Sequence, residues 1–160
     1  MFSKDLFIEF YERVNKSINK LLDHCQNLSE EELNREMEGF GYPTIRLQLH
    51  HMIGAEKYWV GVLLGRIDAD DDSHLYTSID SLVAFNNEVS KATIEYLNSC
   101  DEQEFTTERT MLTWGNRKKT LKPFNVLMRT QTHVYHHQGQ VLAMCRLLGK
   151  PGKGLDYPIE

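Results

Sequence analysis

The sequence predicts an all-α protein, a four-helix bundle, from three observations. Along four long segments, apolar residues recur at steps of three and four, which is the pattern of amphipathic helices. Cap-forming and turn-forming residues separate these segments, and the remaining sequence carries no strong strand pattern. The length of 160 residues is sufficient for one substantial core, so we expect a single domain over residues 1–160.

The first long helix is predicted over residues 4–28, where apolar positions have helical spacing. Ser29 then has the character of an N-cap, because acidic residues follow it and Glu32 stands three positions later. A short helix is therefore expected from Ser29, ending before Gly39-Phe40-Gly41-Tyr42-Pro43.

The second long helix is predicted from Ile45 to Leu64, with Thr44 as its cap and Gly65 as the residue that ends it. His51 lies on its apolar face. The residues that fall within about 40° of His51, at about 100° per residue, are Leu47, Ala55, Tyr58 and Val62. His50 and Glu56 point away from this face by the same geometry.

An acidic segment, residues 66–76, follows and is interpreted as an exposed, solvated loop that contains Asp68, Asp70, Asp71 and Asp72. The glycine turn and alternating ligands of an EF-hand loop are missing, which argues against calcium binding. The third long helix is expected over residues 78–98. Residues 105–119 are expected to form a turn or a small hairpin.

The last long helix is predicted over residues 122–148, with Pro123 in its first turn and Gly149 after its end. The residues within about 40° of His133 on this helix are Val126, Arg129, His137, Gln140, Met144 and Leu147. The two histidines therefore share its core face. The tail after this helix is predicted to be irregular and to pack against the bundle.

Charge and cysteine usage narrow the classes of partner and the compartment. A net charge of −5 argues against nucleic-acid binding, and the basic run Arg117-Lys118-Lys119 is interpreted as a solvated loop. The three cysteines stand far apart without a C-x-x-C pair, which favours a reducing compartment. The sequence shows no signal-peptide core and no apolar stretch of about eighteen residues. We therefore expect a cytoplasmic protein without a membrane span.

Three histidines on two predicted helix faces form a candidate metal site. His133 and His137 stand one helical turn apart, and His51 occupies the apolar face of the second helix. Burying an imidazole without a partner costs about 1 to 3 kcal/mol, and coordination of one ion by all three removes this cost. An alternative stays open, in which the three histidines pack without metal in a helical interaction protein.

Neighbouring residues exclude two familiar metal sites. A zincin requires glutamate beside the first histidine of H-E-x-x-H, where this chain has Val134. Di-iron bundles use Glu-x-x-His pairs, and Thr130 stands where such a glutamate is needed. What remains is a mononuclear site of three neutral imidazoles, which leaves at least one coordination position open, as in catalytic zinc sites.

Two motifs resemble those of the DinB/YfiT-like (damage-inducible DinB) superfamily of metal-dependent bundle proteins. They are His133-x-x-His136-His137-x-Gly139-Gln140 and Leu49-x-His51-x-x-x-x-Glu56-x-x-Trp59. The resemblance implies a DinB/YfiT-like four-helix bundle, typically a homodimer, with one divalent cation held by His51, His133 and His137. Gln138 departs from the arginine that is usual at its position, which affects a contact beside the site.

Characterised members of that superfamily include thiol-dependent transferases and isomerases and a metal-dependent hydrolase. The resemblance therefore implies an enzyme whose metal site activates water or a low-molecular-weight thiol, for hydrolase or S-transferase chemistry on a small molecule. Zinc and nickel are the preferred ions, with iron and manganese as alternatives. The competing hypothesis is a non-catalytic, stress-related metal-binding or sequestering protein, in which the metal ion stabilises the bundle.

Residues near the candidate ligands receive supporting roles. His136 lies to one side of the ligand face, and Gln140 is expected to bond either a ligand or a neighbouring helix. Arg129 is expected to pair with a carboxylate of the bundle, in preference to an anionic group of a substrate. Glu56 is expected to bond the backbone or a neighbouring helix. Core or interface positions are expected for the aromatic residues Tyr58, Trp59 and Trp114, with Trp114 alternatively bordering a pocket.

Overall fold

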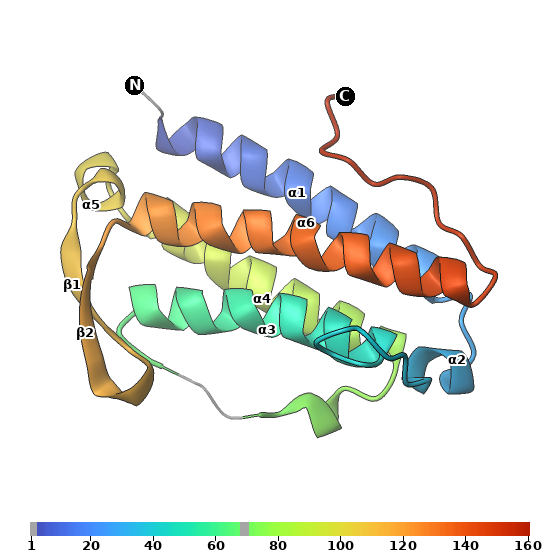
Figure 1. Ribbon diagram of the computed structural model, residues 1–160. Coiled ribbons are helices and arrows are strands. Elements are labelled where there is room, and N and C mark those ends of the chain that lie inside the picture. The colour runs from blue at the N-terminus through green and yellow to red at the C-terminus, as the bar shows by residue number, and fades with distance from the viewer. Residues whose placement is uncertain (1–2, 68–70) are drawn as a thin grey trace.

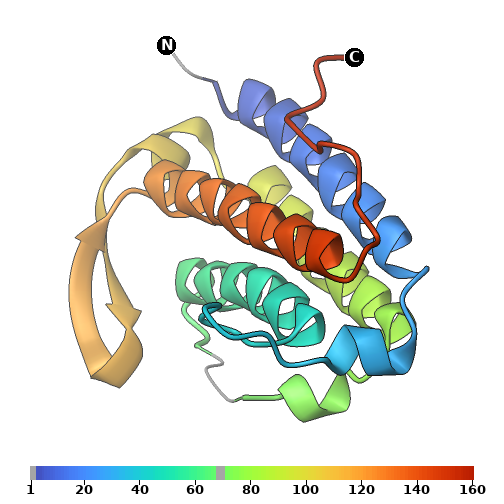
Figure 2. The ribbon, with the colours of Figure 1, turned by 45° about the vertical axis from the view of Figure 1, so that its right-hand side comes forward.

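A computed structural model describes residues 3–67 and 71–160, and this part of the chain is mainly helical. The four long helices that lie alongside one another are α1 (Lys4–Cys25), α3 (Ile45–Leu63), α4 (Ile79–Ser99) and α6 (Pro123–Leu147) (Figure 1). Helix α3 packs against α4 and α6, and α1 packs against the same two helices (Figure 2). The prediction of a mainly helical fold is confirmed.

Shorter elements connect the long helices. They are α2 (Glu30–Asn34), the 3-10 helix η1 (Ser73–Leu75), α5 (Glu102–Thr106), strand β1 (Arg109–Thr113), the 3-10 helix η2 (Trp114–Asn116) and strand β2 (Arg117–Leu121). Helix α5 is an addition to the predicted elements. The Asp101 side chain caps it by accepting a hydrogen bond from the Glu104 amide, at 2.6 Å. A helix of five residues is too short for apolar periodicity to reveal.

Side-chain caps set the helix starts close to their predicted positions. The Thr44 hydroxyl accepts a hydrogen bond from the Leu47 amide, at 3.1 Å, and α3 begins at the next residue. At α2, Ser29 and Glu32 form the predicted capping box. Helix α1 is shorter than predicted, because it ends at Cys25 and not at Leu28.

The buried apolar residues form two clusters between the four long helices. One cluster includes Leu21, Leu49 and Val141, and the other includes Phe7 and Leu127. Each cluster joins residues of α1, α3, α4 and α6.

The buried faces of α3 and α6 differ in part from the predicted ones: Leu47, His51 and Ala55 are half-buried and Leu147 is exposed, whereas Glu56, which was expected to point away from the core face, is buried. Helical geometry gives the direction of each side chain but not which direction the neighbouring helices cover. Because α3 and α6 are packed along their lengths, side chains on their facing turns are held in a defined register.

Strands β1 and β2 form a small hairpin over residues 109–121, where a turn or a small hairpin was expected over residues 105–119. They are antiparallel, with Arg109 opposite Leu121 and Thr113 opposite Arg117. Gly115 (φ 61°) and Asn116 (φ 56°) adopt the left-handed conformation that the tight reversal requires. One interpretation needs correction here: the basic run 117–119 lies on β2 and not in a loop, although its side chains are exposed as expected.

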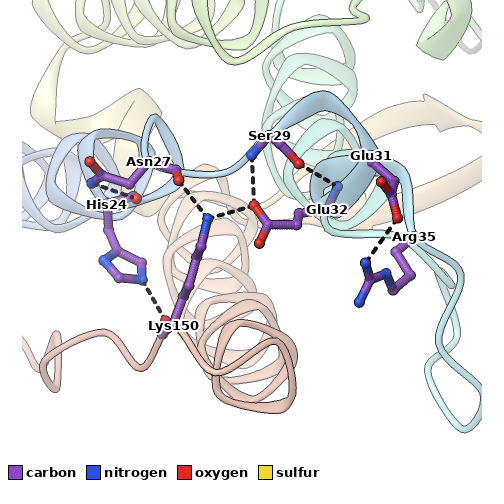
Figure 3. Close-up of polar contacts among 7 residues, drawn as sticks. All are labelled: His24, Asn27, Ser29, Glu31, Glu32, Arg35 and Lys150. Atoms are coloured by element: carbon purple, nitrogen blue, oxygen red, sulfur yellow. Dashed lines mark hydrogen bonds and ion pairs between the residues drawn. The ribbon is translucent and has the colours of Figure 1, made fainter.

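The tail after α6 packs against the first part of the chain, as predicted. The Lys150 ammonium donates to Glu32 Oε2, at 2.6 Å, and to the Asn27 carbonyl, at 2.9 Å (Figure 3). His24 Nε2 donates in turn to the Lys150 carbonyl, at 3.1 Å. Farther along, the ring of Tyr157 stacks on Phe10. The tail is thus fixed to α1 and to the α1–α2 turn.

Within the described ranges, no helix combines the length and the apolar character that a membrane crossing requires. All three cysteines are buried free thiols.

Candidate metal centre

Helices α3 and α6 bring together the three histidines that the sequence singles out. His51 projects from α3, and His133 and His137 project from successive turns of α6. One ring nitrogen of each lies within 4.8 Å of the corresponding atoms of the other two. The expected meeting of the two helix faces is therefore observed, and the cluster is able to hold a metal ion.

The separation of two ring nitrogens agrees with coordination of one ion. His51 Nε2 and His133 Nε2 are 3.2 Å apart. Two nitrogens bound to one zinc ion at about 2.0–2.1 Å, with a tetrahedral angle between them, lie about 3.3 Å apart. The imidazole pair is thus spaced as two ligands of a common ion would be.

Gln48 on α3 orients the third imidazole. Its side-chain amide donates to the Tyr42 carbonyl, at 2.9 Å, and to Gln140 Oε1, at 2.8 Å, so both of its protons are used. Gln48 Oε1 must then accept from His137 Nδ1, at 2.6 Å. This contact places the proton of His137 on Nδ1 and leaves Nε2 free to bind a metal ion.

Gln140 and His136 extend the same network. The Gln140 amide donates to His136 Nε2, at 2.8 Å, while its oxygen accepts from Gln48. Gln140 therefore contacts a neighbouring helix and reaches His137 only through Gln48. His136 lies outside the three-histidine cluster, as the helical geometry predicted.

Electrostatics keep the three imidazoles in the form that binds metal. Burial, together with the neighbouring histidines, lowers the pKa of His137 to about 3 and the pKa of His51 to about 4. Burial also lowers the pKa of His133, with smaller contributions from His136 and Arg129. All three are neutral at pH 7, so their lone pairs are available to a cation.

Tyr42 covers one side of the cluster. Its ring stacks on His51, with ring centroids 4.1 Å apart and an interplanar angle of 23°. From the sequence, Tyr42 was expected only as part of a helix-breaking segment, and Gln48 was not identified as a functional residue. The position of Gln48, three residues before His51, was the one local signal that could have identified it.

A cavity of about 550 Å³ opens beside the cluster. His51 and His133 line it, whereas His137 is not among its lining residues and is only 4% exposed. Its other walls come from α3, the hairpin and the segment before η1, and they include Tyr58, Trp59 and Trp114. Trp114 thus borders a pocket, the alternative foreseen for it. The volume lies within the range of small-molecule sites, about 300–1,000 Å³.

The acidic segment contributes Asp71 and Asp72 to the wall of this cavity. Asp72 Oδ1 lies 2.8 Å from His50 Nε2, and Asp72 Oδ2 accepts from the Lys57 ammonium at 2.9 Å. Burial acts to raise the pKa of Asp72, but the bonds from Lys57 and His50 outweigh it and hold this pKa low. The solvated-loop interpretation is therefore wrong for Asp72. Asp71 is exposed, and Asp68 and Asp70 lie outside the described residues.

Arg129 does not pair with a carboxylate of the bundle, contrary to expectation. Among the residues that the structure describes, none forms an ion pair or a side-chain hydrogen bond with its guanidinium group, which is exposed at the cavity wall. The core carboxylate nearest in sequence to His51, Glu56, bonds other helices instead. Its Oε1 accepts from Tyr11 Oη and from Thr93 Oγ1, each at 2.6 Å.

Comparison with known proteins agrees with this fold. The model of the DinB family matches residues 1–160. The fold is similar to that in the crystal structure of a DinB-like protein from Bacillus cereus ATCC 10987, with a TM-score of 0.75 and 21% identity over 96% of this chain and 100% of that chain. No curated protein matches the sequence. The match along its whole length shows that the chain belongs to the DinB family.

Proposed function

We propose that this protein is a metal-dependent enzyme that acts on a small molecule, with one divalent cation held by His51, His133 and His137. The observation that carries the proposal is the convergence of three neutral imidazoles at the wall of a 550 Å³ cavity. A site with three protein ligands leaves a coordination position for another molecule. Because His51 and His133 line the cavity, we place that open position on the cavity side.

The donor set limits the ion and its chemistry. Imidazole suits zinc and nickel, which we prefer, and also iron and manganese. When bound, such an ion lowers the pKa of water or of a thiol and so supplies a nucleophile at neutral pH. Hydrolysis and transfer of a low-molecular-weight thiol both use a nucleophile of this kind.

The residues of this chain then have defined tasks. Gln48 holds His137 with its metal-binding nitrogen directed away from the amide, and Tyr42 shields one face of His51 from water. Of the two described carboxylates that line the cavity, Asp72 is occupied by Lys57 and His50. The other, Asp71, accepts a hydrogen bond from a backbone amide at 3.0 Å. Neither is placed as a general base, which favours activation of the nucleophile by the ion itself.

The experiment is metal analysis of protein purified without a nickel column, followed by activity screens. We expect about one divalent ion per chain in the wild type and loss of that ion in His51→Ala and His133→Ala. His74→Ala, at an exposed position, is the matched control and should retain the metal. Stoichiometric metal in both ligand variants would contradict the assignment. The screens pair a panel of low-molecular-weight thiols with electrophiles, and test ester and amide hydrolysis.

A non-catalytic metal-binding or sequestering role is the second candidate. One observation favours it: the three ligands come from two packed helices, so an ion would join α3 to α6. In that case metal would raise thermal stability while every thiol-transfer and hydrolase screen stayed blank.

Three further expectations accompany the proposed enzyme. The four long helices form the DinB/YfiT-like bundle that positions the site, the protein acts as a homodimer, and it works in the cytoplasm. Light scattering on purified protein tests the dimer, and fractionation of cells tests the compartment.

A further inference from the structure

Arg129 places at the wall of the cavity a cation that pairs with no other described residue. It stands on α6 one turn before His133, and its charge contributes to the low pKa of that histidine. A guanidinium group carries five N–H donors in a planar fork that matches a carboxylate. No residue in the described part of the chain uses these donors. The group is therefore available to a ligand that enters the cavity.

A second part of the cavity wall is aromatic and fixed in place. Trp114 at the hairpin tip stacks on Tyr58, with ring centroids 4.3 Å apart and an interplanar angle of 7°. The Trp114 amide donates to Tyr58 Oη, at 2.9 Å, and Trp59 meets the Trp114 ring edge to face at 5.5 Å. Trp114 remains 46% exposed, so part of its ring is open to a ligand. Flat apolar groups pack favourably on such a surface.

The other charges of the cavity leave the α6 side positive. Lys57 and Asp72 form an ion pair, and Asp72 also bonds His50. Asp71, the remaining charged residue of the wall, lies in the segment before η1, where a backbone amide bonds it. Among the described residues of the wall, Arg129 is thus the cation without a counterion, and a divalent cation in the histidine cluster would add to the positive potential beside it.

We propose that the cavity selects small molecules with a carboxylate on a flat, aromatic or unsaturated body. Arg129 binds the carboxylate through paired hydrogen bonds, and the wall of Trp59 and Trp114 packs against the body. The size of the cavity suits a ligand of this kind. This inference rests on the proposed function only in taking the cavity as the substrate site, and it names the substrate class.

The test uses a matched pair of probes, 3-phenylpropanoate and its uncharged amide, 3-phenylpropanamide. Both tryptophans of the chain line the cavity, so intrinsic fluorescence reports its occupancy without a label. Calorimetry on the same samples gives the dissociation constants. A hydrogen bond between Arg129 and a charged carboxylate is stronger than one to a neutral amide, by an amount that corresponds to about tenfold or more in affinity. We therefore expect 3-phenylpropanoate to bind at least about tenfold more tightly than 3-phenylpropanamide.

Variants assign the preference to its source. In Arg129→Gln, the dissociation constants of the two probes should differ by no more than about twofold. Arg129→Lys should retain part of the preference for the carboxylate, because lysine keeps the charge but lacks the planar pair of N–H donors. Arg146→Gln, at an exposed position of the same helix that does not line the cavity, should retain the full preference. Trp114→Leu should weaken the binding of both probes by a similar factor. Circular dichroism verifies that each variant is folded.

Metal-loaded and metal-free protein are both measured, which separates two ways of failing. Equal binding of the two probes, no binding of either, or a preference that survives in Arg129→Gln would overturn the inference. The last result would mean that the metal ion receives the carboxylate. If metal binds but Arg129 gives no selectivity, this inference fails alone. If selectivity depends on Arg129 and no metal binds, the proposed metal-dependent function fails alone.

Discussion

Substitution of Glu56 separates the hydrogen bonding of this buried carboxyl group from its charge. Glu56 is only 4% exposed, and its Oε1 accepts from Tyr11 Oη and Thr93 Oγ1. In Glu56→Ala the Tyr11 hydroxyl loses this acceptor, at about 1 to 3 kcal/mol, whereas Thr93 retains the Val89 carbonyl. With about 1 kcal/mol more for the cavity, we expect a loss of about 2 to 4 kcal/mol in the free energy of unfolding.

Glu56→Gln should change the free energy of unfolding far less than Glu56→Ala does. Glutamine keeps an oxygen that accepts from Tyr11, and it adds an amide donor. The Gln131 side chain hydrogen-bonds Glu56 as a donor, and its Oε1 is buried without a partner, so a flip of the Gln131 amide would turn that oxygen toward the new donor. A hydrogen bond from the new amide to this oxygen satisfies both groups. At about pH 5, we therefore expect the free energy of unfolding to change by no more than about 1 kcal/mol in either direction.

The pH dependence supplies a second readout. Burial raises the pKa of Glu56, and the hydrogen bonds from Thr93 and Tyr11 only partly oppose this. In the unfolded chain, glutamate ionises at about pH 4.3. The stability that the protonated carboxyl group of the folded protein contributes is therefore complete below that pH, and it is lost as the pH rises through the higher pKa of the folded state. Glutamine does not ionise. Relative to the wild type, Glu56→Gln should therefore become more stable as the pH rises from about 5 to about 8.

Urea unfolding of metal-free protein, followed by circular dichroism at both pH values, measures these differences without a contribution from metal binding. Two results would refute the reasoning. One is equal destabilisation by alanine and by glutamine. The other is a difference between Glu56→Gln and the wild type that does not change with pH.

Three other predictions concern the metal site and the tail. Gln48→Ala should weaken metal affinity by about 10- to 100-fold, because His137 loses the acceptor that orients it; competition with a chelating dye measures this. Removing the metal should lower the melting temperature, since free metal at about 100 times its dissociation constant stabilises the fold by about 2.7 kcal/mol; scanning calorimetry with and without chelator detects it. Gly152→Ala should lower the free energy of unfolding by about 1 kcal/mol, because the added Cβ lies 2.6 Å from Leu142 Cδ2. Gly154→Ala is the control: its added Cβ meets nothing within 4 Å, so thermal unfolding should show no change.

The long helices and the histidine cluster could be predicted because helical periodicity determines them. His133 and His137 stand four positions apart on α6, so one helical turn brings them together, and His51 lies on a face of α3 that packs beside them. The capping residues Ser29 and Thr44 likewise act within a few positions of their own sequence. Local rules were sufficient for these features.

Features that depend on contacts between distant segments could not be predicted in the same way. Gln48 bonds His137 across two helices, 89 positions away in sequence. Arg129 was expected to find a carboxylate, but helical azimuth does not reveal which acid lies opposite, and the structure places none there among the described residues. Asp72 was interpreted as solvated because the packing of its segment against α3 leaves no periodic signal.

The central claim is that His51, His133 and His137 hold one divalent cation that faces the cavity. The most direct test is a crystal structure of the metal-loaded protein, with anomalous difference maps recorded above and below the absorption edge of the bound element. We predict one anomalous peak per chain, at about 2.0–2.2 Å from a nitrogen of each of the three histidines, with a coordination position open to the cavity. A loaded protein with no peak among these residues, or with its metal bound elsewhere, would contradict the claim.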